Sequence, residues 1–373
     1  MRWSWKVATV AGIGIYVHWT FLLIVAWIAY IYASSAGRLL AAIDGIVFVL
    51  ALFACVVAHE LGHALTAKRF GIRTRDITLL PIGGVARLER MPEEPLREFL
   101  VAVAGPIVTA VLALVFATAA VMLWGVQSLF EMDMMQSPLI VRLAWVNAFL
   151  LAFNLLPAFP MDGGRMLRAL LHTAMDYAKA TRIAATVGQG FAVLFGIIGF
   201  FINPFLIIIA FFVFLGAHAE VQAAQVKSLT GGVPVRAAMV TNFRTLSPNA
   251  TLHEAVQMLL SGEQQDFPVV ENGQVLGVLT RAALLRAVAE SGNAARRVTE
   301  LMSMECKPVQ ENEMLERAFE RMRENGCPVL PVVRHGELVG MLTLENVGEW
   351  MMIQNAMRRS HERGGSEPLP HHP

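Results

Sequence analysis

The sequence predicts a polytopic α-helical membrane domain followed by a smaller soluble α/β domain. Two observations lead to this fold class: the composition of the whole chain, and a sharp change in composition along it. Of the 373 residues, 55% are hydrophobic and only 16% are charged, whereas soluble domains carry about 25% charged residues. Long apolar runs end near Ala224, and the chain from Lys227 onward has an ordinary mixed composition. We expect a transmembrane domain over residues 1–224, a soluble domain over 225–357 and a disordered tail over 358–373.

Six apolar runs are candidates for membrane spans, each of which needs about 20 largely apolar residues. They cover residues 16–33, 43–69, 99–124, 139–156, 184–201 and 204–219. Basic residues concentrate in the loops 68–97 and 165–182, and the loops between them are poor in Lys and Arg. This alternation predicts that both termini and the soluble domain lie in the cytoplasm. We expect Asp44, at the outer start of the second span, to be an N-cap or interfacial group.

Charge and cysteine content exclude two classes of protein. A formal net charge of +1 argues against a generally basic nucleic-acid binder, so we expect no nucleic-acid partner. The three cysteines, Cys55, Cys306 and Cys327, are too widely spaced to predict a disulfide framework or a cysteine zinc site. A metal site in this chain would therefore be made of histidines and carboxylates.

The second span contains the segment His59-Glu60-Leu61-Gly62-His63. On a helix, the two histidines are four residues apart, so both imidazoles project from one face and can share a metal ion. Glu60 could then act as a general base toward water at the metal. In a soluble helix the same pattern would also fit a surface stretch or a pair of buried core histidines. Ionisable groups inside an apolar span are costly, however, and they mark functional sites, which favours metal binding.

A catalytic zinc site needs a third protein ligand, and Asp162 is the best candidate. It follows Pro157 and Pro160, which break the helix, so its backbone is irregular. Such backbone is tolerated at membrane depth only where it is buried in protein or lines a watery cavity. Asn154 could hold a substrate carbonyl or stabilise the oxyanion. The alternative is that Asp162 merely caps a following helix over residues 163–177.

At these motifs the chain resembles the site-2 protease family of intramembrane zinc metalloproteases, in its prokaryotic branch with a C-terminal pair of CBS domains. Four segments carry the resemblance, in the order of the family and over most of residues 1–224: residues 59–63, the glycine-rich segment 81–87, Ala104-Gly105-Pro106 and the proline-rich segment 154–165. The resemblance implies a multi-pass protein of the prokaryotic cytoplasmic membrane.

The resemblance also implies roles for individual residues. His59, His63 and Asp162 would bind one zinc ion per chain, Glu60 would be the general base, and Asn154 would orient the substrate or the oxyanion. Gly83 and Gly84 would belong to a short membrane-embedded strand that pairs with an unwound substrate. The implied activity is hydrolysis of a peptide bond within or near a transmembrane segment, that is, regulated intramembrane proteolysis. Substrates of the family include membrane-bound transcription regulators, anti-sigma factors and signal-peptide remnants.

The soluble part contains an internal duplication. Residues 267–280 align without a gap with residues 330–343, with half of the positions identical, and the same register pairs Met239 with Met302. In each copy an apolar run is split by a two-residue turn, Asn272-Gly273 or His335-Gly336, which predicts a β-hairpin. Each copy therefore reads as helix, strand, turn, strand and helix.

This duplication resembles a tandem CBS pair, or Bateman module, with copies at residues 232–291 and 295–354. The resemblance implies a regulatory or dimerising module that commonly holds an adenine nucleotide between its copies. In nucleotide-binding CBS domains, an acidic residue three places after the strand-terminal Thr or Ser often contacts the ribose. Ala283 and Asn346 stand at those positions, so nucleotide binding and a purely regulatory or dimerising role both remain open.

Two other classes of function are compatible with intramembrane histidines. A CBS-regulated zinc or cation transporter is one, but transporters usually contain paired repeats, and the membrane part holds no second copy of the segment 59–63. A non-catalytic scaffold is the other, and the intact Glu60 disfavours it. The sequence thus favours an intramembrane zinc metalloprotease with a cytoplasmic CBS pair.

Overall fold

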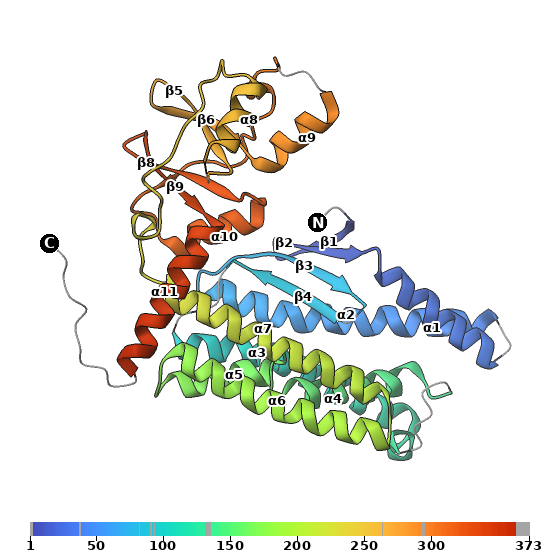
Figure 1. Cartoon of the computed structure of the whole chain (residues 1–373). Helices are drawn as coiled ribbons and strands as arrows, with labels where there is room; N and C mark the ends of the chain where they lie inside the picture. The colour runs from blue at the N-terminus through green and yellow to red at the C-terminus, as the bar shows by residue number, and fades with distance from the viewer. Residues whose placement is uncertain are drawn as a thin grey trace. The chain divides into compact units, whose positions relative to one another are not determined.

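The structure, a computed structural model, describes residues 3–36, 39–81, 83–89, 92, 94–130, 136–262, 264–291 and 295–362. The chain divides into two compact units, Met1–Ala224 and Gln225–Pro373, called here the N-terminal and C-terminal units (Figure 1). Helix α7 (Phe205–Thr230) begins in the first unit and continues into the second.

The N-terminal unit combines a small sheet with a set of apolar helices. Its described strands are β1 (Ser4–Val10), β2 (Ile13–His18), β3 (Thr74–Leu80) and β4 (Gly83–Leu88). Its described helices before α7 are α1 (Phe21–Ala36), α2 (Leu39–Arg69), α3 (Pro95–Trp124), the 3-10 turn η1 (Val126–Leu129), α4 (Leu139–Asn154), α5 (Asp162–His172) and α6 (Tyr177–Phe201).

Six of these helices correspond to the six predicted spans. Within the described residues, α2, α3, α6 and α7 are long and apolar enough to cross a membrane, whereas α1 and α4 are apolar but shorter. The prediction that the first span is helical from residue 16 is wrong, because Ile13–His18 forms β2 and α1 begins at Phe21. Ile13 and Ile15 are both buried on one face of this strand. A hydropathy average over several residues does not distinguish this two-residue alternation from an apolar helix.

The four strands form one sheet in the order β1-β2-β3-β4. β2 and β3 are parallel and the other two pairs are antiparallel. The resemblance implied a single short strand here, so the sheet is larger than expected. Ile13, Ala64 and Ile77 form a small core between the sheet and α2, and β3 and β4 lie against that helix (Figure 1). β4 is at the end of the sheet, so one of its edges has no partner strand in the described part of the chain.

A buried arginine joins three helices of this unit. The Arg142 guanidinium on α4 is 2% exposed and donates to the Asp44 carboxylate on α2 at 2.8 Å and to the Tyr32 hydroxyl on α1 at 3.2 Å. The expectation that Asp44 caps the start of its helix is wrong, since α2 begins at Leu39. Asp44 instead neutralises an arginine that could not be buried alone.

The C-terminal unit contains the two predicted copies. The first consists of the 3-10 turn η2 (Val235–Ala237), α8 (Leu252–Leu260), β5 (Phe267–Glu271), β6 (Gln274–Leu279) and α9 (Arg281–Ser291). The second consists of the 3-10 turn η3 (Val298–Glu300), β7 (Val309–Gln310), α10 (Leu315–Asn325), β8 (Val329–Arg334), β9 (Glu337–Thr343) and α11 (Leu344–Glu362). Residues 358–362 of the expected tail are therefore helical, and 363–373 lie outside the described residues.

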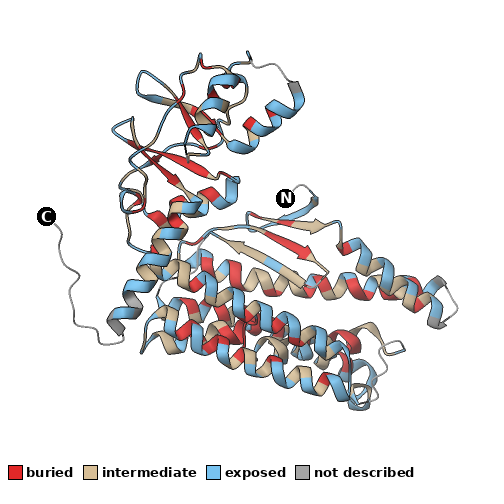
Figure 2. Cartoon of the chain, in the orientation of Figure 1, coloured by how far each residue is buried: buried red, intermediate tan, exposed pale blue. Residues whose placement is uncertain are grey.

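Both copies fold as the predicted hairpins. Asn272-Gly273 and His335-Gly336 each have positive φ at both turn positions, as the tight turn of a twisted hairpin requires. Runs of consecutive apolar residues in β8 and β9 are buried in one core (Figure 2). A Cβ on Gly277 would lie 2.9 Å from Met302 Sδ, and one on Gly340 would lie 2.8 Å from Met239 Sδ. Each copy thus packs the leading methionine of the other against its own hairpin.

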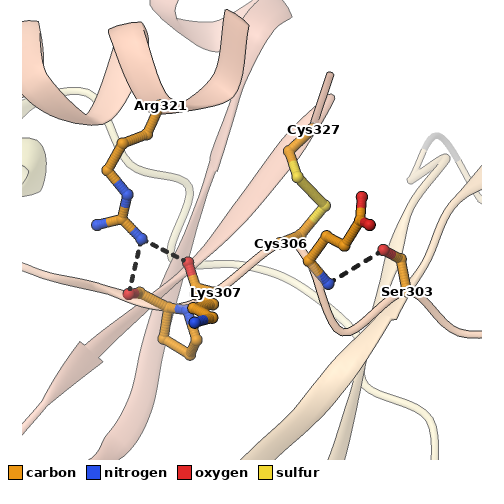
Figure 3. Close-up of a disulfide and its surroundings, with 7 residues drawn as sticks. Ser303, Cys306, Lys307, Arg321 and Cys327 are labelled. Atoms are coloured by element: carbon orange, nitrogen blue, oxygen red, sulfur yellow. Dashed lines mark hydrogen bonds between the residues drawn. A yellow bond between two sulfur atoms is a disulfide. The ribbon is translucent and has the colours of Figure 1, made fainter. Parts of the chain in front are cut away.

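The expectation that the cysteines are too widely spaced to form disulfides is wrong for one pair. Cys306 and Cys327 form a disulfide with a Cα–Cα distance of 5.6 Å (Figure 3), and both are buried. The 21-residue separation concealed this pair, because α10 and the turn that follows it return the chain to the segment before β7.

Candidate metal centre

Two helices bring three ionisable side chains to one point inside the N-terminal unit. His59 and His63 lie one turn apart on α2, and Asp162 is the first residue of α5. His59 Nε2 and His63 Nε2 are 3.1 Å apart, and each is 3.1 Å from Asp162 Oδ2. All three residues are buried. The two predicted histidines and the predicted carboxylate, 99 residues further along the chain, therefore converge as a group that could hold a metal ion.

A very close approach of α3 forms one wall of this centre. A Cβ on Gly62 would lie 2.9 Å from the Ala104 carbonyl oxygen, so α2 lies directly against the backbone of α3 at this point. A Cβ on Gly105 would lie 2.2 Å from His63 Nε2 and 2.8 Å from His59 Cε1. Only a glycine at position 105 leaves room for both imidazoles.

Hydrogen bonds from α3 orient both histidine rings. Thr109 Oγ1 donates to the Gly105 carbonyl at 3.3 Å, so it accepts from His59 Nδ1 at 2.8 Å. The Val101 carbonyl, which can only accept, lies 2.7 Å from His63 Nδ1. Each Nδ1 therefore carries the proton, and each Nε2 presents a lone pair to the other ring and to Asp162.

A metal ion placed between these three acceptor atoms would satisfy all of them. The donor set is two imidazole nitrogens and one carboxylate oxygen, which is the composition of a catalytic zinc site with an open fourth position. The Val101 carbonyl is a typical second partner of a metal-bound histidine, and the Thr109 hydroxyl supplies an acceptor in the same place for His59. The residues present thus fit zinc.

Asp162 is placed by a tightly packed, irregular segment. The N-cap of α5 is Met161, and no side-chain cap bond is present, so Asp162 does not serve as a cap. A Cβ on Gly163 would lie 2.2 Å from the Leu156 carbonyl oxygen, and one on Gly164 would lie 2.6 Å from the Ala158 carbonyl carbon. The glycine pair therefore lets the first turn of α5 pack directly on the loop before it. The helix ends at His172, five residues earlier than expected.

The loop before Asp162 is enclosed by protein. Ala158 and Phe159 are fully buried, in clusters with residues of α6 and α7. A Cβ on Gly216 of α7 would lie 2.8 Å from Pro160 Cδ. Irregular backbone is tolerated at membrane depth under this condition.

Glu60 faces the sheet. Its Oε2 accepts a hydrogen bond from the Ala86 backbone N–H of β4 at 3.3 Å. A Cβ on Gly84 would lie 2.9 Å from Glu60 Cγ, so glycine at this position lets β4 approach the carboxylate. Gly83 begins the strand with φ +137°, which favours glycine. The structure therefore brings Gly83, Gly84 and Glu60 together, beside the two histidines.

Asn154 is the last residue of α4 and is half-buried. Among the described residues, no hydrogen bond joins it to His59, His63 or Asp162. Its role as an orienting residue stays a prediction.

The chain matches two protein-family models. Residues 47–140 and 126–197 match the model of Peptidase family M50, and residues 235–290 and 298–352 match the CBS domain model. A zinc metalloprotease of Methanocaldococcus jannaschii is 34% identical over 282 residues, covering 75% of this chain and 78% of that protein. The chain belongs to peptidase family M50.

Two further proteins are similar to the M50 peptidase. Rip3 of Mycobacterium tuberculosis is 28% identical over 374 residues, covering 93% of this chain and 92% of that protein. A solved structure of a site-2 protease from Methanocaldococcus jannaschii is 35% identical, with a TM-score of 0.44, and covers 59% of this chain and 95% of that one. The M50 peptidase is thus an intramembrane zinc metalloprotease with a CBS pair, and the transporter alternative is less well supported.

The CBS pair of the M50 peptidase contains a cleft of about 520 Å³ between its two copies. The first copy contributes Asp266, Thr280 and Arg281, and the second contributes Glu305, Cys306 and Cys327. Burial raises the pKa of Asp266, although the Arg281 backbone N–H donates to its Oδ1 at 2.9 Å. The Thr280 hydroxyl accepts from the Ala283 N–H at 3.2 Å and so begins α9.

Proposed function

We propose that His59, His63 and Asp162 bind one zinc ion per chain and that Glu60 is the general base and acid for cleavage of a peptide bond within or near a transmembrane segment. One observation carries the proposal. Three acceptor atoms lie 3.1 Å apart, while both Nδ1 protons are held by acceptors on α3. A cation completes this arrangement.

Zinc bound by these residues supplies Lewis-acid chemistry, since it polarises the scissile carbonyl and makes water more acidic. Glu60, beside His59 on α2, takes the proton of the attacking water and later gives it to the leaving amine. The hydrogen bond from Ala86 holds the Glu60 carboxylate on the side of β4. Asn154 would orient the substrate or the oxyanion from the end of α4.

The substrate class follows from the position of β4. A transmembrane helix hides its carbonyls in its own hydrogen bonds, so the substrate has to unwind before it is cleaved. The edge of β4 that has no partner strand among the described residues offers replacement backbone hydrogen bonds to an extended segment. Gly83 and Gly84 start this strand beside Glu60, and we assign them to substrate binding.

The cellular setting of the enzyme is part of the proposal. Basic residues in the loops 68–97 and 165–182 support a cytoplasmic membrane protein whose C-terminal unit is cytoplasmic. The substrate would be a membrane-bound transcription regulator, an anti-sigma factor or a signal-peptide remnant. The CBS pair would dimerise the enzyme or bind an adenine nucleotide in its 520 Å³ cleft.

Two variants test the metal centre. Glu60→Gln should lower the cleavage rate of a single-span substrate in liposomes by about 10²–10⁴-fold, because the general base is lost, while zinc content stays at one per chain. Asp162→Ala should lose zinc. Cleavage by Glu60→Gln at the wild-type rate, or full zinc content in Asp162→Ala, would contradict the assigned roles. Membrane stubs that accumulate with Glu60→Gln in cells would identify the substrate.

A further inference from the structure

A second buried charge cluster lies on the helix that carries Asp162. The Arg168 guanidinium on α5 is 1% exposed. Its Nε donates to Glu98 Oε1 of α3 at 2.7 Å, and its Nη2 lies 2.6 Å from the same oxygen. Its Nη1 donates to Glu220 Oε2 of α7 at 3.0 Å.

Aromatic rings complete the surroundings of this guanidinium. Its carbon lies 5.1 Å from the centroid of Phe159 and 4.9 Å from that of Tyr177. Phe159 belongs to the buried loop before Asp162, and Tyr177 begins α6. Arg168 therefore contacts the three helices around α5 and the loop that leads into it.

We propose that Arg168 is a positioning residue, which holds α5, and with it Asp162, against α3 and α7 in the geometry that the metal needs. This inference rests on the proposed role of Asp162 as a ligand. α3 also supplies Thr109 and Val101, which orient the two histidines. The Arg168–Glu98 pair thus fixes the carboxylate ligand to the same helix that fixes the imidazole ligands.

The shape of arginine matters here. A guanidinium presents donors in two directions at once, and lysine cannot reproduce this fork. Glu98 is 2% exposed and Glu220 is partly exposed, so losing the first contact should cost more than losing the second. Breaking a buried ion pair leaves the remaining charge without a partner. We expect this loss to displace α5, and not only to lower the stability of the protein.

Zinc affinity and kinetics of the full-length enzyme test this role. In Arg168→Lys we expect the zinc Kd to rise and kcat to fall by roughly 10- to 100-fold, because small displacements of a catalytic group have effects of this size. KM should stay near the wild-type value, since β4 is not touched. The absorption spectrum of the cobalt-substituted enzyme should change, because it reports ligand geometry. Glu220→Gln should give a smaller effect of the same kind.

The matched control is Arg142→Lys, which disturbs the hydrogen bonds of a buried arginine to Asp44 and Tyr32, neither of which lies on α5. It should lower the melting temperature but leave the cobalt spectrum and the zinc Kd unchanged. The inference is overturned if Arg168→Lys keeps the wild-type spectrum and zinc Kd, or if Arg142→Lys changes them equally. A failure of the ligand assignment is separate, because it would appear as retained zinc in Asp162→Ala.

An independent observation concerns the disulfide in the C-terminal unit. Cys306 and Cys327 both line the 520 Å³ cleft and are 5% and 1% exposed. Cys306 follows Ser303 in the segment before β7, and Cys327 follows Gly326, the left-handed C-cap of α10 (Figure 3). The bond therefore joins two segments that form one wall of the cleft.

We infer that this pair is a redox switch for the cleft. In the cytoplasm, where we place the C-terminal unit, disulfides are rare and usually transient and redox-sensing. A thiolate of the pair attacks a small disulfide of the glutathione type, which releases one small thiol and leaves a mixed disulfide. The second thiolate attacks the mixed disulfide and releases the second small thiol. Two protein thiols are thus oxidised and one small disulfide is reduced to two thiols.

Reduction frees the two segments from each other, and ligand affinity should change with them. After the full-length enzyme is incubated with glutathione disulfide and then denatured, two of the three cysteines should be protected from a maleimide reagent. The oxidised and reduced forms should differ at least fivefold in AMP Kd or in cleavage rate. Cys327→Ser should lose this difference, whereas Cys55→Ser should keep it. Three reactive thiols after oxidation, or equal Kd and equal rate in both forms, overturn the inference.

Discussion

Both units bury apolar side chains, but they differ in the ionisable side chains that they bury. The N-terminal unit buries His59, His63, Glu98, Arg142, Asp162 and Arg168. In the C-terminal unit, Thr230 is the one buried polar residue that we find among the described positions, and the two cores consist of aliphatic, sulfur-containing and aromatic side chains. The N-terminal unit also exposes large apolar side chains, and Phe200, Phe201 and Ile202 are 77–78% exposed.

This difference indicates which contacts determine the structure of each unit. Lipid is as apolar as a protein core, so a membrane domain gains little from burying more apolar surface and relies on close packing and polar contacts. Glycines 62, 105, 163 and 164 each allow such close packing at the metal centre. The C-terminal unit is solvated by water, and burial of Leu330 and Leu342 stabilises it directly.

The largest expected effect is that of Gly105→Ala. The added Cβ would lie 2.2 Å from His63 Nε2, so either the ring or α3 has to move. We expect the cleavage rate to fall by roughly 10²-fold or more and zinc to be lost in dialysis. The measurement is zinc content together with cleavage of a single-span substrate.

A control for this variant is Gly190→Ala, at which a Cβ would have no neighbour within 4 Å. It should bind zinc and cleave as the wild type does. Wild-type zinc content in Gly105→Ala would show that close packing at α3 is not what specifies the centre.

The sequence predicted which three side chains converge, because the segment 59–63 places two histidines on one helix face and Asp162 stands on the irregular backbone after Pro157 and Pro160. The hairpins of the C-terminal unit were predictable because their glycine turns are local signals. Thr109, Val101 and Arg168 were not predictable, because their roles depend on how α3 and α5 approach other helices. The Cys306–Cys327 pair escaped for the same reason, since 21 residues and a helix intervene.

In the C-terminal unit, the large effects should come from the apolar core. Leu342 of β9 is fully buried in that core, and Leu342→Ala should destabilise the unit by about 2–5 kcal/mol through lost burial and a cavity. Hydrogen exchange of the full-length protein should show faster exchange in β8 and β9. The zinc content should not change, and loss of zinc in this variant would break the separation of the two units.

A smaller effect is expected for Thr109→Val, which keeps the shape of the side chain and removes the acceptor of the His59 Nδ1 proton. Loss of such a partner typically weakens metal affinity or activity by about 10- to 100-fold. A competition assay with a zinc chelator measures the change. Thr109→Ser, which retains the hydroxyl, should restore most of the affinity. Equal affinities in the two variants would show that the His59 ring is oriented by other contacts.

The smallest expected effect tests whether local polar contacts in the C-terminal unit act only locally. Thr251 and Glu254 form a capping box at the start of α8, with Glu254 N–H donating to Thr251 Oγ1 at 3.3 Å and Thr251 N–H donating to Glu254 Oε2 at 2.9 Å. Thr251→Ala should cost about 1 kcal/mol, which corresponds to roughly fivefold faster hydrogen exchange in residues 252–260. Thr251→Ser should exchange at nearly the wild-type rate. A polar contact in this unit thus stabilises one helix by a small amount, whereas in the N-terminal unit the buried hydroxyl of Thr109 orients the ring of His59.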